Sequence, residues 1–231
     1  MTHHAAKQVR ALYLVAGLLV FSIMTLILGE IAEDVRDGEP LTITDVRFSN
    51  WLHTHAWAPL TKAMWVITSL HASLVVCGAA LLLGIYLWRR RERYWVVALW
   101  LSVFGGLLLN KTLKLIFHRA RPRFRDAAQL FTSYSFPSGH TMMATVFYGV
   151  LAAYFFATTK DWRRRVLIIF AAGFLILLVG FSRMYLGAHY LSDVLGAMAE
   201  GLAWLSLCLT AAYSLWPKRN HAAQATADSL K

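Results

Sequence analysis

Six apolar stretches, each close to the length needed to cross a bilayer, constrain the fold of this chain more than any other feature. An α-helix needs about 20 mostly apolar residues to span ~30 Å of hydrocarbon. The chain is 58% hydrophobic and 15% charged, whereas soluble domains are roughly half apolar and a quarter charged. We therefore predict an all-α integral membrane bundle of six transmembrane helices. The predicted spans are residues 11–29, 63–88, 94–110, 141–159, 166–181 and 190–216.

The segments outside these spans define the domain organisation. Residues 1–10 are polar and are followed by no small-residue cleavage site, so the first span is expected to be retained and not removed as a signal peptide. One membrane domain is predicted over residues 1–220. The polar, Ala-rich residues 221–231 are predicted to form a flexible cytoplasmic tail.

The acidic segment between the first two spans contains one further helical pattern. Apolar and aromatic residues recur at i, i+3, i+4 and i+7 from Phe48 to His55, and they follow Thr42-x-x-Asp45, a pattern typical of a helix start. We predict a short amphipathic helix that lies in the membrane interface, within the first outward loop.

The charge of the chain restricts its partners. The formal net charge is +11, from 23 Lys and Arg against 12 Asp and Glu. Such an excess fits nucleic acid, anionic lipid or an anionic substrate. The basic residues lie in short loops between apolar stretches, which makes nucleic acid the poorest of these partners and favours the lipid bilayer and an anionic substrate.

The distribution of basic residues also predicts the orientation in the membrane. Six spans place both termini on one side, where thirteen Lys and Arg are found against ten on the other side. Three of those ten, Lys114, Arg121 and Arg183, are candidate site residues, and without them the ratio is thirteen to seven. The positive-inside rule then predicts cytoplasmic termini and outward-facing histidine-bearing loops.

The cysteine and histidine patterns give no indication of a metal or redox site. Cys77 and Cys208 both fall inside apolar stretches and are expected to be buried without a disulfide. The sequence contains no C-x-x-C or H-E-x-x-H motif. We therefore expect neither a metal nor a cofactor. His71, in the second span, is expected to be a hydrogen-bonded residue of the bundle interior.

The third span is expected to continue as helix through Lys114, and a basic loop is expected from His118 to about Phe136. Lys114 precedes Arg121-Pro122 by seven residues, about two helical turns, so the two cations can project from one side of a helix that ends at Pro122. The pair fits either a patch for anionic lipid headgroups or a clamp for an anionic substrate.

Four further residues of this stretch lie beside the pair. Arg119, Arg123 and Arg125 suit either a second phosphate of a diphosphate substrate or simple attraction of headgroups. His118 is expected to lie in the interface.

A second polar stretch, Pro137-Ser138-Gly139-His140, directly precedes the fourth span. Ser138 is a plausible N-cap, and Gly139 lets the backbone approach a ligand closely. Free N–H groups at a helix start form an anion site, beside which His140 can donate a proton to a leaving group. The alternative is an ordinary helix cap followed by an interfacial histidine.

A third polar stretch, residues 182–193, carries Arg183, His189 and Asp193 between the last two spans. Polar groups at the edge of hydrocarbon are costly and suggest function. His189 and Asp193 are four residues apart, so on a helix they share a face, and the carboxylate can hold the imidazole in one tautomer. A structural ion pair at a helix end is the alternative. The guanidinium of Arg183 matches phosphate.

The three polar stretches are all expected at the outward ends of spans, where the bundle can bring them together. Cations, backbone amides and two histidines at one depth suit phosphoryl transfer, which depends mostly on positioning and charge stabilisation. The patterns K-x₆-R-P, P-S-G-H and S-R-x₅-H-x₃-D occur in this order between Lys114 and Asp193. They resemble the three-part motif of the type 2 phosphatidic acid phosphatase superfamily, and every specified position matches.

This resemblance implies a metal-independent lipid phosphatase. His189, oriented by Asp193, is expected to attack the terminal phosphorus and form a phosphohistidine, and His140 to protonate the leaving oxygen. The phosphoryl oxygens are expected to be bound by the remaining motif residues, namely Lys114, Arg121, Ser138, Gly139 and Arg183.

Several functions remain open for such a site. The implied substrates are an isoprenoid diphosphate, phosphatidylglycerol phosphate, phosphatidic acid or diacylglycerol diphosphate, hydrolysed at the outer face of a bacterial cytoplasmic membrane. Transfer of the phosphate to another lipid acceptor is compatible with the same residues. A transporter or headgroup-binding scaffold would leave the two histidines and Asp193 without a role. The sequence does not define an oligomeric state.

Overall fold

The computed structural model describes residues 3–38, 40–122, 124 and 133–215. All regular structure in these residues is helical, which confirms the predicted fold class. The elements are α1 (His3–Asp37), α2 (Pro40–Thr54), α3 (Ala58–Leu70), α4 (Ser73–Arg89), α5 (Arg93–Trp100), a π-helical segment η1 (Leu101–Gly105), α6 (Gly106–Phe117), α7 (Gly139–Thr158), α8 (Trp162–Tyr185) and α9 (Leu191–Leu215). The predicted tail, residues 221–231, lies outside the described residues.

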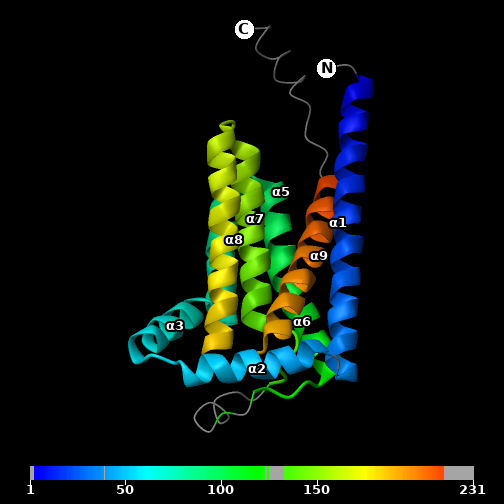
Figure 1. Cartoon of the computed structure of the whole chain (residues 1–231). Coiled ribbons are helices and arrows are strands. Elements are labelled where there is room, and N and C mark those ends of the chain that lie inside the picture. Colours follow the sequence, from blue (N-terminus) through cyan, green and yellow to red (C-terminus); the bar gives the residue numbers. More distant parts are fainter. Residues whose placement is uncertain (1–2, 39, 123, 125–132, 216–231) are drawn as a thin grey trace.

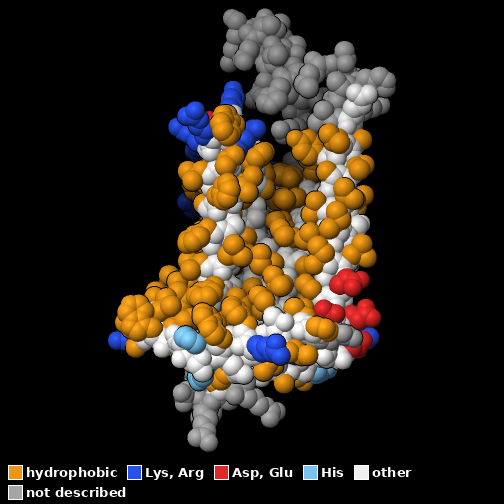
Figure 2. Space-filling model, in the orientation of Figure 1, with side chains coloured by type: hydrophobic (Ala, Val, Ile, Leu, Met, Phe, Trp, Pro, Cys, Tyr) orange, Lys and Arg blue, Asp and Glu red, His pale blue; other side chains and the backbone are white. Residues whose placement is uncertain are grey.

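The long helices form one bundle whose flank is apolar. α1 packs along α9, and α7 packs against both α8 and α9 (Figure 1). α1 begins and α9 ends at the same end of this bundle (Figure 1). Apolar side chains cover the flank, and Lys and Arg side chains gather at the end where α8 begins (Figure 2). An exposed apolar surface of this extent is what a lipid-facing bundle requires.

Five of the helical segments are long and apolar enough to cross a membrane, in the part of the chain that the structure describes. A sixth span is obtained when α3 and α4 are taken together. The predicted count of six therefore holds only with a broken second span. The first span is also longer than predicted, because α1 continues past Gly29 to Asp37.

The prediction of a continuous second span over residues 63–88 is wrong. α3 and α4 are separated at His71 and Ala72 and differ in direction by 48°. At the break, the His71 N–H bonds to the Thr68 carbonyl at 3.1 Å, and His71 Nδ1 lies 2.7 Å from the Ile67 carbonyl. The side chain of His71 thus satisfies a carbonyl that a continuing helix would bond, and the chain can turn.

The prediction that helix continues through Lys114 is confirmed, but the prediction that it extends to Arg121 and ends at Pro122 is wrong. α6 ends at Phe117, and His118 takes a left-handed conformation with φ 47°. Pro122 disfavours helical geometry in the residue before it and removes a backbone donor. Arg121 therefore lies in an irregular connection and not two helical turns beyond Lys114.

α2 lies across the end of the bundle at which α7 and α9 begin (Figure 1). Its buried residues are Asp45, Ser49 and Leu52, whereas Trp51 is 55% exposed. The predicted helix is present, but its buried face differs from the predicted apolar face. Trp51 lies on the exposed side, and the buried face includes the carboxylate of Asp45. Leu52 packs in an apolar cluster with residues of α3, α8 and α9, which attaches α2 and α3 to the bundle.

The interior of the bundle is filled by an apolar cluster contributed by α4, α5, η1, α7 and α9. Its fully buried members include Leu99, Val103, Met142 and Val146. Both cysteines are free thiols; the predicted burial is confirmed for Cys208, whereas Cys77 is half-buried. This packing fixes the start of α7 against α9 and so positions the polar end of the bundle.

Candidate active site

The three motif stretches meet at the end of the bundle that α2 covers (Figure 1). Lys114 lies in the last turn of α6, and Arg121 lies in the connection that follows. Ser138 to His140 begin α7, and residues 183–193 run from the end of α8 into α9. The expectation that these stretches come together is confirmed by the contacts between them.

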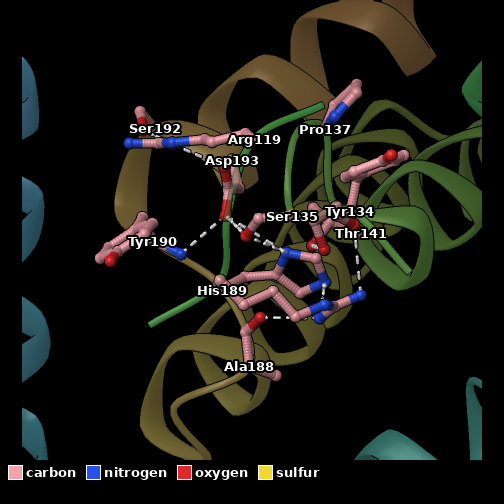
Figure 3. A network of polar contacts seen from close by, with 12 residues as sticks. Arg119, Tyr134, Ser135, Pro137, Thr141, Ala188, His189, Tyr190, Ser192 and Asp193 are labelled. Atoms are coloured by element: carbon pink, nitrogen blue, oxygen red, sulfur yellow. Dashed lines mark hydrogen bonds and ion pairs between the residues drawn. The ribbon is translucent and has the colours of Figure 1, made fainter. Parts of the chain in front are cut away.

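His189 and Asp193 form the centre of these contacts (Figure 3). His189 Nδ1 lies 3.3 Å from Asp193 Oδ2, and both side chains are almost completely buried. The prediction that His189 and Asp193 share a helix is wrong, because α9 begins at Leu191, after His189. Asp193 lies in the first turn and also accepts the Tyr190 N–H at 2.9 Å, as an acidic residue does in a capping box.

The other ring nitrogen of His189 faces a cation. His189 Nε2 lies 3.2 Å from the guanidinium of Arg121. Arg121 also donates to the Ala188 carbonyl at 2.7 Å and to the Ser133 carbonyl at 2.7 Å. Arg121 is thus held beside the nitrogen that Asp193 leaves available for chemistry.

Burial lowers the pKa of His189 well below its usual range, although the hydrogen bond with Asp193 opposes this shift. Desolvation disfavours the charged form of an imidazole. His189 is therefore neutral near pH 7. Its proton lies on Nδ1, because a carboxylate can only accept, and a lone pair remains on Nε2.

Two further cations of the motif surround this position. Lys114 Nζ donates to the Tyr134 and Ser135 carbonyls at 2.8 and 3.2 Å. Arg183 is 3% exposed and donates to the Thr68 hydroxyl at 2.6 Å. Both cations lie close enough to Arg121 for mutual repulsion. Three like charges in a partly buried space favour the binding of an anion.

The start of α7 contributes the remaining motif residues. Ser138 occupies the N-cap position, its N–H donates to the Asp193 carbonyl at 3.0 Å, and its hydroxyl accepts from Thr141. A Cβ added at Gly139 would lie 3.2 Å from Asn110 Oδ1, so a side chain there would crowd α6. His140 is half-buried and has Arg183 as a charged neighbour.

Arg119 is held by two carboxylates, a contact that the sequence did not predict. It donates to Asp193 Oδ1 at 2.6 Å and to Asp45 Oδ2 at 2.7 Å. Burial opposes its charge, but Asp193 and Asp45 outweigh burial and raise the pKa of Arg119. Arg119 therefore forms ion pairs with two carboxylates of the protein. Arg123 and Arg125 lie outside the described residues.

The two histidines considered outside the motif are both engaged by neighbours. His71 Nε2 lies 2.6 Å from the Tyr148 hydroxyl, which confirms the prediction of a hydrogen-bonded residue inside the bundle. His71 is also within electrostatic range of His140, so it lies near the site. His118 is exposed and contacts the ring of Tyr134 edge-on at 4.4 Å.

Sequence reasoning missed three polar residues at the site. The Ser135 hydroxyl donates to Asp193 Oδ2 and lies 3.4 Å from His189 Nδ1. Asn110 donates to Glu200 Oε2 at 2.8 Å, beneath the loop that contains Pro137. Glu200 could have been found as a lone carboxylate in an apolar span. Nothing in the local pattern distinguishes Ser135 from an ordinary loop serine.

The acidic residues near the site do not form a metal-ligand set. Among the described residues, no group of three or more His, Cys, Asp or Glu side chains has the arrangement of a metal site. The charged side chains closest to His189 are arginines and Asp193. The chemical character of this donor set is that of an anion-binding site.

Replacement of Gly196 by alanine is expected to disturb the site through packing. A Cβ at this position in α9 would lie 2.6 Å from the fully buried ring of Phe136, which adjoins Ser135. Overpacking of this kind costs about 1–3 kcal/mol. Gly196→Ala should lower the thermal midpoint in detergent, whereas Gly173→Ala, with no atom within 4 Å, should not. Equal midpoints for the two variants would contradict the packing.

Comparison with known proteins identifies the class of this fold and site. Residues 95–217, more than half of the chain, match the family model described as "PAP2 superfamily". The chain belongs to the PAP2 superfamily and is a multi-pass membrane lipid phosphatase, a hydrolase. This result confirms the resemblance inferred from the three motifs.

Individual relatives differ in the lipid phosphate that their names specify. Phosphatidylglycerophosphatase B of Bacillus subtilis (strain 168) is 39% identical over 152 residues, which cover 62% of this chain and 70% of the relative. Undecaprenyl-diphosphatase BcrC of the same strain is 32% identical over 134 residues, 55% of this chain and 64% of that one. A lipid A 1-phosphatase of Rhizobium etli is 38% identical over 121 residues, 48% and 47% respectively.

One solved structure has the same architecture. It is a crystal structure described as that of the first transmembrane PAP2 type phosphatidylglycerolphosphate phosphatase from Bacillus subtilis. The TM-score is 0.77 at 28% identity, and the match covers 86% of this chain and 98% of that one. The likeness therefore extends beyond the motif region to most of the bundle.

Proposed function

We propose that this protein removes the terminal phosphate of a membrane lipid through a phosphohistidine intermediate on His189. The observation that carries the proposal is the environment of that imidazole. Its Nδ1 is bound by Asp193, and its Nε2 lies 3.2 Å from Arg121. A buried neutral imidazole with one nitrogen bound by a carboxylate and the other beside a phosphate-binding cation is a prepared nucleophile.

In the first step, the Nε2 lone pair attacks the terminal phosphorus and the bond from phosphorus to the lipid oxygen breaks. His140 donates a proton to the departing oxygen. In the second step, His140 accepts a proton from water, and the resulting hydroxide attacks the phosphohistidine. The bond between phosphorus and Nε2 then breaks, and inorganic phosphate leaves.

The charged residues of the site stabilise the transferred group. Lys114, Arg121 and Arg183 supply three positive charges, and the Ser138 hydroxyl and Gly139 N–H supply donors at the start of α7. Charge accumulates on the equatorial oxygens during transfer, and preorganised donors lower its cost. An Arg beside the reacting phosphorus also suits the planar geometry of three oxygens.

The reaction is proposed to take place at the outer face of a bacterial cytoplasmic membrane. Arg163, Arg164 and Arg165 lie near the start of α8, at the end opposite to the His189 turn. An excess of basic residues favours the cytoplasmic side. The site would then accept a lipid headgroup from the outer leaflet, while the tails remain in hydrocarbon.

The substrate is proposed to be a lipid phosphate monoester or diphosphate of the kinds that the names of the relatives specify. Phosphatidylglycerol phosphate, undecaprenyl diphosphate and lipid A 1-phosphate all present a terminal phosphate on a membrane-anchored group. Phosphatidic acid and diacylglycerol diphosphate share this chemistry and belong in the same panel.

The experiment that tests this proposal is phosphate release by the purified protein from each of these lipids in detergent micelles, with and without a chelator. Release from at least one lipid, unchanged by the chelator, is the expected result. A labelled terminal phosphate that appears on a second lipid and not in water would instead indicate a phosphotransferase. Failure to release or transfer phosphate from every lipid would overturn the proposal.

A further inference from the structure

Asp45 of α2 is a buried carboxylate at the end of the bundle. It is 1% exposed. Its Oδ1 accepts the Ser192 N–H at 2.9 Å, and its Oδ2 accepts from the Ser192 hydroxyl and from Arg119 at 2.7 Å. Both partners of Asp45 are therefore neighbours of Asp193: Ser192 precedes it in the sequence, and Arg119 contacts its side chain.

Arg119 connects the two carboxylates. One of its terminal nitrogens donates to Asp193 Oδ1 and to the Ser192 hydroxyl, both at 2.6 Å, and the other donates to Asp45. The guanidinium also lies over the Tyr190 ring, 4.6 Å from its centroid (Figure 3). Arg119 is thus bound on three sides, and its orientation relative to Asp193 depends on Asp45.

Asp193 divides its two oxygens between the cation and the imidazole. Oδ1 accepts from Arg119, whereas Oδ2 lies 3.3 Å from His189 Nδ1 and accepts from Tyr190 and Ser135. Arg119 holds Oδ1 and so helps to fix the rotation of the carboxylate relative to His189. Asp45 restrains that rotation in two ways, because it holds the far side of Arg119 and the first turn of α9 at Ser192.

Attachment of α2 to the bundle does not by itself require this carboxylate. Leu52 is 3% exposed and packs in the apolar cluster that joins α2 to α3, α8 and α9. Burial of a charged group is costly, and it is offset only by well-placed partners. An apolar residue would anchor α2 at lower cost, so the position of Asp45 fits an electrostatic role at the site.

We propose that Asp45 is a positioning residue for the His189–Asp193 pair, acting through Arg119 and Ser192, so that α2 forms part of the catalytic machinery. This inference rests on the proposed function, since it assigns Asp45 to the same reaction. Asp45 does not touch the substrate, and its removal should affect turnover more than substrate binding.

The test is steady-state kinetics of Asp45→Asn on the best lipid of the panel. The amide keeps the size of the side chain but loses the charge that balances Arg119. In metal sites, loss of a residue that orients a ligand typically costs on the order of 10–100-fold, and a similar loss is expected for a residue that orients His189. We expect kcat to fall by about 10-fold or more with KM within about twofold of wild type.

Two control variants separate positioning from folding and from general charge. Asp37→Asn removes an exposed carboxylate that pairs only with its neighbour Arg36 in the described contacts, and it should leave kcat unchanged. Leu52→Ala loosens α2 without touching the charges, and it should lower the thermal midpoint more than kcat. In an Arg119→Gln background, Asp45→Asn should lower kcat by a smaller factor than in wild type, because only the contact with Ser192 remains to be lost.

The possible outcomes distinguish this inference from the proposed function. An active wild type with equal kcat for Asp45→Asn would overturn the positioning role alone. A fall in kcat that follows the thermal midpoint equally in Asp45→Asn and Leu52→Ala would also overturn it. A wild type inactive on the whole panel would overturn the proposed function and, with it, this inference.

Discussion

Replacement of His189 by alanine is expected to abolish phosphate release. The imidazole provides the nucleophilic lone pair, on Nε2 beside Arg121, and the methyl group of alanine has none to replace it. Loss of a covalent nucleophile typically costs about 10⁶-fold in kcat, with a small residual rate from charge stabilisation. The rate of His189→Ala should therefore fall below about 10⁻⁴ of wild type. Phosphate release from purified protein measures it.

A matched control is available on α2. His55 is exposed and bonds locally, with Nδ1 2.8 Å from the Trp51 carbonyl. His55→Ala should keep the wild-type rate. Incubation with lipid labelled in its terminal phosphate should also give acid-labile labelled protein for wild type and none for His189→Ala. Undiminished phosphate release by His189→Ala would contradict the assignment of the nucleophile.

Replacement of Asp193 by asparagine is expected to have the second largest effect. The amide is nearly isosteric, but its NH₂ must face donors, because Arg119, Ser135 and the Tyr190 N–H all point at this carboxylate. Its neutral side chain also no longer fixes the Nδ1 proton of His189. By analogy with the tautomer-holding carboxylate of serine proteases, kcat should fall by about 10³–10⁴-fold.

The fold of Asp193→Asn should persist, because α9 is held by the apolar cluster of the bundle. A suitable control is Asp161→Asn at the N-cap of α8, where the carboxylate accepts the Arg163 N–H at 3.0 Å. Asn is a good N-cap, so this variant should keep both stability and kcat. A near-normal rate for Asp193→Asn at unchanged stability would reduce Asp193 to a structural role.

The fold class followed from the sequence because apolar length is a direct physical requirement of the bilayer. The limits of the helices did not follow, because they depend on local hydrogen bonds. His71 satisfies the Ile67 carbonyl and allows the second span to bend, and His118 takes a left-handed conformation, so Arg121 does not continue the helix of Lys114. Neither conformation can be recognised from the residue type alone.

The motif residues were predictable as a set, but their supporting contacts were not. The spacing of Thr42 and Asp45 indicated a helix start, yet the carboxylate of Asp45 accepts a hydrogen bond from Ser192, 147 residues further along the chain. Arg119 was one basic residue among several, and only the folded chain shows that it binds Asp193. Periodicity describes which face of a helix is buried, but it does not identify the partner on the other side.

The family match begins at residue 95, so α1 to α4 lie outside it. Nevertheless, α2 provides Asp45 to Ser192, and α3 provides the Thr68 hydroxyl to Arg183 at 2.6 Å. The motif-bearing half is therefore not an exchangeable module. A chimera joined at residue 95 would combine a foreign α2 and α3 with these motif residues and would have to restore both hydrogen bonds. Activity in such a hybrid depends on the compatibility of its two halves as much as on the three motifs.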